Sequence, residues 1–312
     1  MTDSVELLVN PPNEYWIQIC KLIVEAESWL NSLHDYKTWK EAFGDDFELL
    51  VAVDKESKAI LGCITVVHYY GPNSTISMIG CYFVTKENRG RGLGVYLFDQ
   101  AKARCKGNTF LFGAASMTKK YADVHHFNKI TDYAVVRRTV VTTKLRPLLL
   151  NNDPTLILKH PSAVGWDEIE KYLKKYVGKL NIIHVVKALL IQPGSYPLVA
   201  LTTENRIVAL GTVREQHGET LSVGPLIGND PIAACSVLRG ILLNIDNLMD
   251  FKAFAMESPT TNEESDKIIK QLSEGDYKIH FGHELQPQFT EEIVPLPVAH
   301  VYAIGQSDVS LL

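Results

Sequence analysis

The apolar and polar positions of the first part of the chain alternate between strand-like and helix-like spacing. Period-two alternation and β-rich runs predict strands, whereas apolar residues three and four apart predict amphipathic helices. The expected strands cover residues 4–10, 47–53, 60–70, 75–85, 109–115 and 133–145, and the expected helices cover 14–28, 33–43, 93–106 and 119–130. Three of these strands follow one another with short polar turns between them, so we expect an antiparallel meander flanked by helices.

The same order of elements returns after residue 154. Segment 146–154 combines proline with Asn-Asn-Asp turn chemistry, which is typical of a domain boundary. Beyond it we expect strands at 155–159, 197–202, 206–214, 219–224, 251–256, 276–284 and 297–304, and helices at 166–176, 182–190, 231–245 and 262–272. The repeated order predicts two tandem α/β units, residues 1–146 and 155–312, each with a mixed, mostly antiparallel central sheet flanked by helices.

Composition and charge narrow the classes of protein. The chain has 312 residues, of which 46% are hydrophobic and 21% charged, as in a globular protein of two domains. Its net charge of −5 provides no overall positive field to bind nucleic acid or an anionic membrane. No basic segment precedes an apolar core at the start, and no apolar run approaches ~18 residues. We therefore expect a soluble, cytoplasmic protein with neither a nucleic-acid nor a membrane partner.

Neither the cysteines nor the histidines form a metal-binding pattern. The cysteines are widely spaced among apolar residues, and we expect buried thiols rather than a disulfide framework or a zinc ribbon: Cys20, Cys63, Cys81, Cys105 and Cys235. His125 and His126 are adjacent, so on a helix they point about 100° apart, and no third ligand lies nearby in the sequence. We expect no metal.

The most informative chemistry lies between the expected strand at 75–85 and the helix that follows it. Gly90, Gly92 and Gly94 remove side chains at the start of this helix, so several backbone N–H groups can converge on an anion. We expect this loop to hold a pyrophosphate. The dinucleotide-binding motif GxGxxG is excluded, because Val95 stands where this motif needs glycine. The ATP-binding P-loop motif GxxxxGK[ST] does not occur in the sequence.

The arrangement Arg89-x-x-Gly92-x-Gly94 directly after a strand resembles the coenzyme A loop of the GNAT superfamily of acyl-CoA-dependent N-acetyltransferases. The order of elements over residues 4–145 is similar to that family as well. The resemblance implies two tandem GNAT-like units, with acetyl-CoA bound in the first: a splayed strand pairs with pantetheine, and the loop holds the pyrophosphate. The cofactor-binding residues that it implies are Tyr82, Phe83, Val84, Arg89, Gly90, Arg91, Gly92, Leu93, Gly94 and Val95.

The corresponding stretch of the second unit, residues 222–231, lacks the arginine and the paired glycines. Pro225 has no N–H group to donate, and Asp230 places a negative charge where a pyrophosphate would sit. The second unit therefore resembles a degenerate GNAT-like copy that packs against the first and forms a wall of the substrate pocket. We expect coenzyme A to bind once per chain.

Transfer of an acyl group to an amine needs a base and an acid. An ammonium group with a pKa of ~10.4 must lose a proton before it attacks a thioester. Many family members use a strand carboxylate, but residues 74–85 contain none, which leaves His68, acting through water, as the candidate base; alternatively it is a strand histidine satisfied by its surroundings. The resemblance implies that Tyr121 protonates the leaving thiolate, although it can equally be a packing residue.

The basic pairs at 119–120 and 137–138 are expected to be solvated, or alternatively to supply one contact to the 3′-phosphate of coenzyme A. Together these features predict an acetyl-CoA-dependent transferase in which a primary amine, from a small molecule or a protein lysine, attacks the thioester directly at the junction of the units. Two alternatives are a coenzyme A sensor without catalysis and a second unit that binds a protein partner. The sequence has no motif for the amine, the acyl chain length or the oligomeric state.

Overall fold

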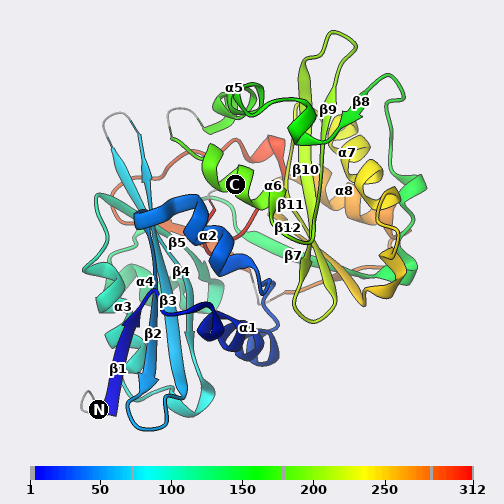
Figure 1. The fold of residues 1–312 in the computed structure, drawn as a ribbon. Coiled ribbons are helices and arrows are strands. Elements are labelled where there is room, and N and C mark those ends of the chain that lie inside the picture. Colours follow the sequence, from blue (N-terminus) through cyan, green and yellow to red (C-terminus); the bar gives the residue numbers. More distant parts are fainter. Residues whose placement is uncertain (1–3, 72–73, 178–179, 282–283, 311–312) are drawn as a thin grey trace.

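The fold is described from a computed structural model that covers residues 4–71, 74–177, 180–281 and 284–310. Two halves of strands and helices lie side by side, and the C-terminus lies between them (Figure 1). None of the helices in these ranges has both the length and the apolar character needed to span a bilayer. All five cysteines are free, and all are buried except Cys105, which is half-buried.

The first half follows the expected order of elements. Its strands are β1 (Val5–Val9), β2 (Phe47–Asp54), β3 (Ile60–Tyr70), β4 (Thr75–Val84), β5 (Asn108–Ala114), β6 (Lys129–Ile130) and β7 (Val135–Val141). Its helices are α1 (Asn13–Glu27), α2 (Asp35–Phe43), α3 (Leu93–Lys102) and α4 (Thr118–His125). Strands β2, β3 and β4 form the expected antiparallel meander. Helix α4 ends five residues before its expected end, because His126 adopts a left-handed φ of 67°.

The second half repeats this order. Its strands are β8 (Ile157–Lys159), β9 (Ser195–Leu201), β10 (Ile207–Gln216), β11 (Thr220–Gly228), β12 (Ala253–Pro259), β13 (Lys278–Ile279), β14 (Leu285–Phe289) and β15 (Val301–Ala303). Its helices are α5 (Trp166–Val177), α6 (Ile183–Ile191), α7 (Pro231–Leu243) and α8 (Glu263–Leu272). Helix α7 begins at Pro231 because the Asp230 side chain caps it by accepting the Ala233 N–H group at 2.9 Å.

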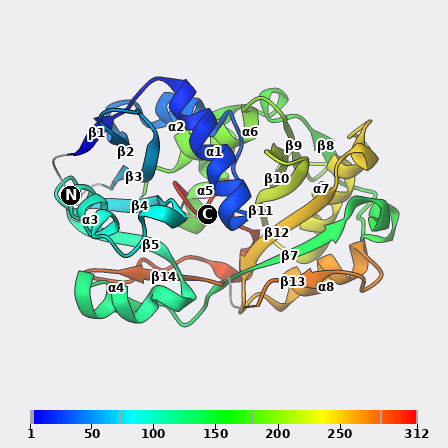
Figure 2. The same cartoon turned by 90° about the horizontal axis from the view of Figure 1, so that it is seen from below.

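The two halves exchange strands. The sheet order is β1-β2-β3-β4-β5-β14-β7-β12-β11-β10-β9-β8. Strand β14, from the last part of the chain, pairs antiparallel with β5, whereas β7 pairs along its whole length with β12. Figure 2 shows β14 beside β5 and α4, and β7 extending into the other half beside β12. The described strands therefore form one continuous sheet.

This exchange corrects the expectation that the strand at 133–145 completes the first unit and that the strands after 276 close the second. Alternation of apolar residues specifies that a segment is a strand but not which neighbour it pairs with, so the partner cannot be read from residues 133–145. Strand β14 was not expected at all, because Pro287 interrupts its short run. Along the chain, segment 146–154 still separates the two series of elements.

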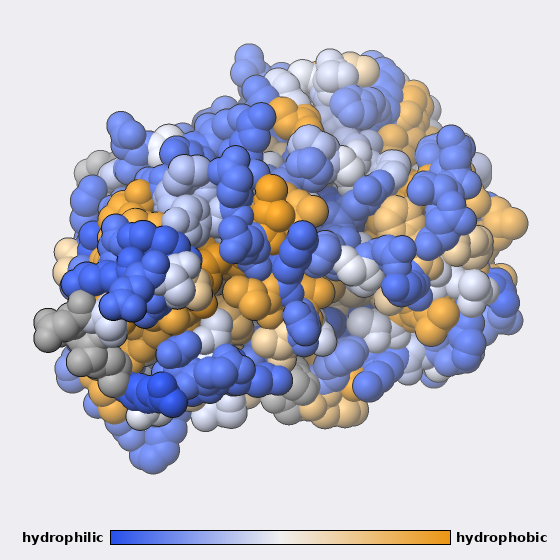
Figure 3. Space-filling model, turned by 60° about the horizontal axis from the view of Figure 1, so that its bottom comes forward, coloured by the Kyte–Doolittle hydropathy of each residue, from blue (hydrophilic) through white to orange (hydrophobic). Residues whose placement is uncertain are grey.

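One apolar core continues across the junction of the halves. It lies beneath α1 and α2 and extends to buried residues of α5 and α6. Trp16 and Trp39 are fully buried and meet edge to face with ring centroids 5.0 Å apart. Phe43 of α2 contacts His184 of α6 at 4.8 Å between ring centroids. Figure 3 shows apolar residues gathered in the middle of one face, between polar surfaces on either side.

A buried ion pair also joins the halves. Arg214 of β10 and Asp35 of α2 are 1% and 0% exposed, and Arg214 Nη1 lies 3.6 Å from Asp35 Oδ1. Burial raises the pKa of Asp35 to about 6, although the Arg214 charge opposes that rise. Arg214 Nη2 also donates to the carbonyl oxygen of Gly305 at 2.5 Å. The same guanidinium therefore ties together both halves and the last part of the chain.

Candidate active site

Strands β4 and β5 pair only over their first residues. Ile76, Ser77 and Met78 pair with residues 108–110, while both strands continue further, to Val84 and Ala114. In β4, a bulge places Cys81 and the residue after it opposite a single residue of β3, and Cys81 has a left-handed φ of 44°. The bulge turns β4 away from β5, and an opening forms between the two strands.

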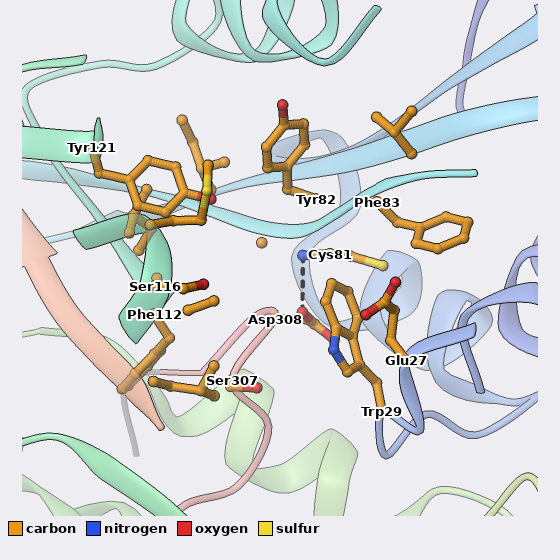
Figure 4. A pocket seen from close by; sticks show the side chains of 18 of the residues that line it. Glu27, Trp29, Cys81, Tyr82, Phe83, Phe112, Ser116, Tyr121, Ser307 and Asp308 are labelled. Carbon is orange, nitrogen blue, oxygen red and sulfur yellow. Dashed lines mark hydrogen bonds between the residues drawn. The ribbon is translucent and has the colours of Figure 1, made fainter. Parts of the chain in front are cut away.

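A cavity of about 1050 Å³ occupies this opening. It is lined by the separated parts of β4 and β5, the start of α3, the end of α1, helix α4, and residues of β7, β12 and β13. Ser307 and Asp308 close it from the C-terminal segment (Figure 4). The cavity therefore joins the expected coenzyme A loop to the junction of the two halves.

The glycine loop presents backbone donors to this cavity. Gly90 and Gly92 have φ values of 73° and 83°, which glycine adopts without strain, and Gly92 caps α3. The Tyr96 N–H group bonds to the Gly92 carbonyl oxygen at 3.0 Å, so the N–H groups before it lie in the first turn of α3 and are available to a ligand. A Cβ at residue 94 would lie 2.3 Å from Tyr82 Oη, so glycine also keeps this approach open.

Most of the residues expected to bind the cofactor line the cavity: Tyr82, Phe83, Val84, Arg89, Gly90, Gly92, Gly94 and Val95. Two do not. Arg91 is exposed outside the cavity, and Leu93 is buried beneath α3. Arg89 is held by an ion pair with Glu27 and donates from Nε to the Val84 carbonyl oxygen at 2.9 Å. Its side chain therefore fixes the loop to α1 and β4, and it places a positive charge at the edge of the cavity.

Tyr121 enters the cavity from α4. Its ring stacks on Phe98 with centroids 5.7 Å apart, and burial raises the pKa of its phenol well above the usual value. A Cβ at Gly113 would lie 2.8 Å from the Tyr121 ring, so glycine in β5 makes room for it. The phenol is a neutral O–H donor facing the opening.

The structure does not bring His68 to this site. Its Nδ1 lies 3.0 Å from Ser77 Oγ, on the paired part of β4 before the strands separate, and it does not line the cavity. Ser77 Oγ in turn accepts the Lys106 N–H group at 2.7 Å. Burial lowers the pKa of His68. These contacts fit the alternative of a strand histidine satisfied by its neighbours.

The basic pair at 137–138 differs from the solvated face that the sequence predicts, whereas Lys119 and Lys120 are both exposed. Arg138 is buried, with Nε 2.9 Å from Asp266 Oδ1, and Arg137 lines the cavity, with Nη2 2.7 Å from Glu257 Oε1. Both lie on β7, which is an interior strand because of the exchange between halves. Lys119 pairs with Asp123 at the surface, whereas Lys120 lines the cavity.

Sequence reasoning missed Asp308. Its Oδ1 accepts the Cys81 N–H group at 2.8 Å (Figure 4). Its Oδ2 accepts the Asn31 amide at 3.0 Å. A Cβ at residue 80 would lie 2.0 Å from the Asp308 carbonyl oxygen, so Gly80 permits this close approach. No local motif marks Asp308, because its partners lie more than 200 residues earlier in the chain.

The equivalent opening of the second half is filled by the chain itself. Strands β11 and β12 pair over Thr220–Val223 and Ala253–Met256, and β15 then pairs with the remainder of β11. A Cβ at Gly224 would lie 1.8 Å from the Ile304 carbonyl oxygen. Asp230 occupies the first turn of α7, as described above. Over the described residues, no three His, Cys, Asp or Glu side chains come together as a metal site.

The fold and the site define a two-unit α/β protein whose first half presents a glycine loop, a helix N-terminus and a strand opening to one large cavity. Residues 16–124 match the family model described as "Acetyltransferase (GNAT) family". For residues 16–124, this match confirms the resemblance to the GNAT family. Members of this family are typically acyl-CoA-dependent N-acyltransferases.

The whole chain is similar to several known proteins. An uncharacterized protein of Caenorhabditis elegans is 22% identical, with 76% of each chain covered. A protein of Pyrococcus horikoshii provisionally assigned as an acetyltransferase has a TM-score of 0.69 at 15% identity, covering 98% of this chain and 95% of its own. A tandem GNAT protein from the clavulanic acid biosynthesis pathway has a TM-score of 0.61 at 11% identity, covering 91% and 98%. The tandem fold is thus confirmed.

Proposed function

We propose that this chain is a cytoplasmic, acetyl-CoA-dependent N-acetyltransferase that acts on a primary amine. The observation that carries the proposal is the continuity of one cavity from the glycine loop, through the opening between β4 and β5, to the junction of the halves. One end offers donors for a pyrophosphate and the other offers room for an acceptor. A volume of about 1050 Å³ lies at the upper end of the range usual for ligand pockets, ~300–1,000 Å³.

In this proposal the pyrophosphate lies on the first turn of α3, where backbone N–H groups and the helix dipole favour an anion. Val84 and Phe83 offer the edge of β4 to the pantetheine arm. Lys120, at the cavity wall, is placed to contact a phosphate group. The second half contributes acceptor contacts and no second coenzyme A site, because β15 fills its opening and Asp230 caps its helix.

The amine attacks the thioester directly. Cys81 is a cysteine in the cavity wall, but a hydrogen bond with Cys63 and burial raise the pKa of its thiol, which leaves it a poor nucleophile. A covalent acyl-enzyme on Cys81 is therefore disfavoured. The nitrogen forms its bond to the carbonyl carbon, the carbon–sulfur bond breaks, and the Tyr121 O–H group protonates the departing thiolate.

We propose that residues 1–146 are the catalytic unit and residues 155–312 its companion. Strand β14 of the second unit pairs with β5 of the first, and β7 of the first unit pairs with β12 of the second. The acceptor is a small-molecule amine or a protein lysine that enters between them. Among similar structures, one is described as a glucosamine N-acetyltransferase region of a fungal enzyme, which makes amino sugars a sensible class to include.

The test is turnover by the full-length chain. Acetyl-CoA is supplied with a panel of amines, namely a polyamine, glucosamine, free amino acids and a lysine-containing peptide, and release of the free thiol is followed together with the mass of the product. We expect one class to be N-acetylated with saturating kinetics. Tight acetyl-CoA binding without acetylation of any amine would instead favour the sensor alternative, and absence of acetyl-CoA binding would refute both.

A further inference from the structure

We infer that the C-terminal segment, residues 304–310, completes the active site of the first half, and that its Asp308 is the base that takes the proton from the acceptor amine. This inference rests on the proposed function. It assigns a catalytic residue that lies outside the GNAT domain matched at residues 16–124. Strand β4 has no carboxylate of its own, and Asp308, near the other end of the chain, supplies one.

The segment is held in place at several points. Arg214 Nη2 donates to the Gly305 carbonyl oxygen at 2.5 Å, and Arg214 is itself paired with Asp35 of the first half. After Asp308, the Tyr69 hydroxyl donates to the Val309 carbonyl oxygen. The Ser310 N–H group bonds back to Gln306 at 2.8 Å, which closes a turn around Asp308. A residue fixed on both sides in this way is suited to hold a reacting group in one position.

Asp308 contacts β4 at its bulge. Its Oδ1 is bonded to the N–H group of Cys81, the bulged residue that turns β4 away from β5. Figure 4 shows Asp308 and Tyr121 reaching from different elements toward the same space. Both line the one cavity, so an amine between them can meet a carboxylate on one side and a phenol on the other.

The surroundings of Asp308 suit a proton acceptor. Burial raises the pKa of its carboxyl, and the hydrogen bonds from Asn31 and Cys81 partly oppose that rise. Two charged side chains face it, one from each half: Glu257 of β12 raises its pKa, and Arg137 of β7 lowers it. Asp35 of α2 is a further buried acid nearby. A carboxylate with a raised pKa is a stronger base than a solvated one.

The proton balance is complete without another reactant. The ammonium form of the acceptor loses one proton to the Asp308 carboxylate, which becomes a neutral acid and later returns the proton to water. The free amine attacks, its carbon–nitrogen bond forms as the carbon–sulfur bond breaks, and Tyr121 protonates the thiolate. The second proton lost by the nitrogen restores Tyr121. The products are an amide, the free thiol of coenzyme A and one proton.

The first test variant is Asp308→Asn, which keeps the shape of the side chain. Its amide oxygen can still accept the Cys81 N–H group. A flip of the Asn31 amide would turn Asn31 Oδ1, which has no hydrogen-bond partner among the described residues, toward the new N–H group. The Gln306 Nε2 group, which donates to Asp308 Oδ2 at 3.3 Å, would lose this acceptor. The probe is the amine of the panel that the wild type acetylates fastest. We expect turnover to fall by about 10²–10⁴-fold, with acetyl-CoA affinity unchanged by calorimetry.

The second variant, Glu257→Gln, removes a charge that faces Asp308 but keeps a partner for Arg137. The rate of the wild type rises with pH as Asp308 deprotonates, so the loss of a charge that raises the Asp308 pKa should move this acid limb to lower pH. A residue that only supported the structure would not produce such a shift. In Asp308→Asn, the rise in rate that follows deprotonation of Asp308 should be missing, so that the rate depends on pH only through the ionisation of the amine.

The outcomes separate this inference from the proposed function. An amine acetylated by the wild type, with the same rate and acid limb in Asp308→Asn, refutes the role of Asp308 and leaves the acetyltransferase proposal intact. A slow Asp308→Asn variant combined with an unshifted limb in Glu257→Gln also refutes it, because another group would then be titrating. If Asp308→Asn does not fold, the shift in Glu257→Gln decides the question. No acetylation by the wild type refutes both proposals.

Discussion

At the scale of single residues, two kinds of side chain determine the chemistry of the cavity. Glycines at 80, 92, 94 and 113 clear space for backbone or ring atoms that any side chain would displace or strain. Against this background, Tyr121 and Asp308 are the acid and the base that the proposed reaction uses. Tyr121→Phe removes only the hydroxyl group and Asp308→Asn replaces only one carboxylate oxygen, so both roles can be tested.

Gly92→Glu should weaken acetyl-CoA binding. The change adds a carboxylate where the pyrophosphate is expected and disturbs donors worth about 1.5–3 kcal/mol for each charge-assisted hydrogen bond, so we expect at least a tenfold loss of affinity. Calorimetry on the wild type should show one equivalent per chain. The matched control is Gly275→Glu, since Gly275 has the same φ of 83° in open space. Equal affinities for the two variants would contradict the assignment.

Tyr121→Phe should reduce turnover by about 10²–10⁴-fold while acetyl-CoA affinity stays the same, because only the proton donor is removed. Burial raises the pKa of Tyr121, so the wild-type phenol should remain protonated at alkaline pH and give no decline in rate there. Tyr133→Phe is the control, since Tyr133 is a buried tyrosine outside this cavity whose hydroxyl has no hydrogen-bond partner among the described residues. A wild-type rate in Tyr121→Phe would show that the residue only packs.

At the scale of elements, the buried pair of Asp35 and Arg214 connects α2, β10 and the C-terminal segment. Removal of one partner leaves an uncompensated buried charge, which costs about 3–5 kcal/mol. We therefore expect Arg214→Met to lower the free energy of unfolding by several kcal/mol, as measured by chemical denaturation. The double variant with Asp35→Asn should recover much of the loss, and a double variant no more stable than Arg214→Met would contradict this explanation.

The pH dependence of this variant has a definite sign. Burial already raises the pKa of Asp35 from 3.8 to about 6, and loss of the Arg214 charge raises it further. A carboxyl whose folded pKa lies above its unfolded value favours the folded state when protonated, and this contribution is lost as pH rises through that interval. Arg214→Met should thus be less destabilised below about pH 5 than at neutral pH.

At the scale of the whole molecule, the exchange of β7 and β14 makes the halves interdependent. Residues 1–146 alone would leave the edge of β5 without β14 and would leave β7 without β12. We expect this fragment to be insoluble or unfolded, and to co-purify with residues 147–312 when both are expressed together. The full chain should unfold in one calorimetric transition. A fragment 1–146 that folds alone and binds acetyl-CoA would contradict this view.

The sequence predicts the secondary-structure elements and motifs that depend on the spacing of neighbouring residues. It does not predict strand pairings and side-chain contacts between residues far apart in the chain. The glycine-rich segment before α3, the meander and the helix that begins at Pro231 each follow from neighbouring residues, and the structure bears out these elements. The partners of β7, the inward position of Arg137 and the placement of Asp308 depend on pairings between residues more than 100 positions apart. The sequence points to His68 as the base because residues 74–85 contain no carboxylate, whereas the base that we infer, Asp308, lies near the other end of the chain.

The central claim is that this chain transfers an acetyl group from coenzyme A to an amine. The most direct measurement is mass spectrometry on a metabolite extract incubated with the full-length protein and isotopically labelled acetyl-CoA. We predict an N-acetylated product that carries the label with the wild type and forms much more slowly with Gly92→Glu. The claim would be contradicted if the wild type binds acetyl-CoA and yet no labelled amide forms with either the extract or the amine panel.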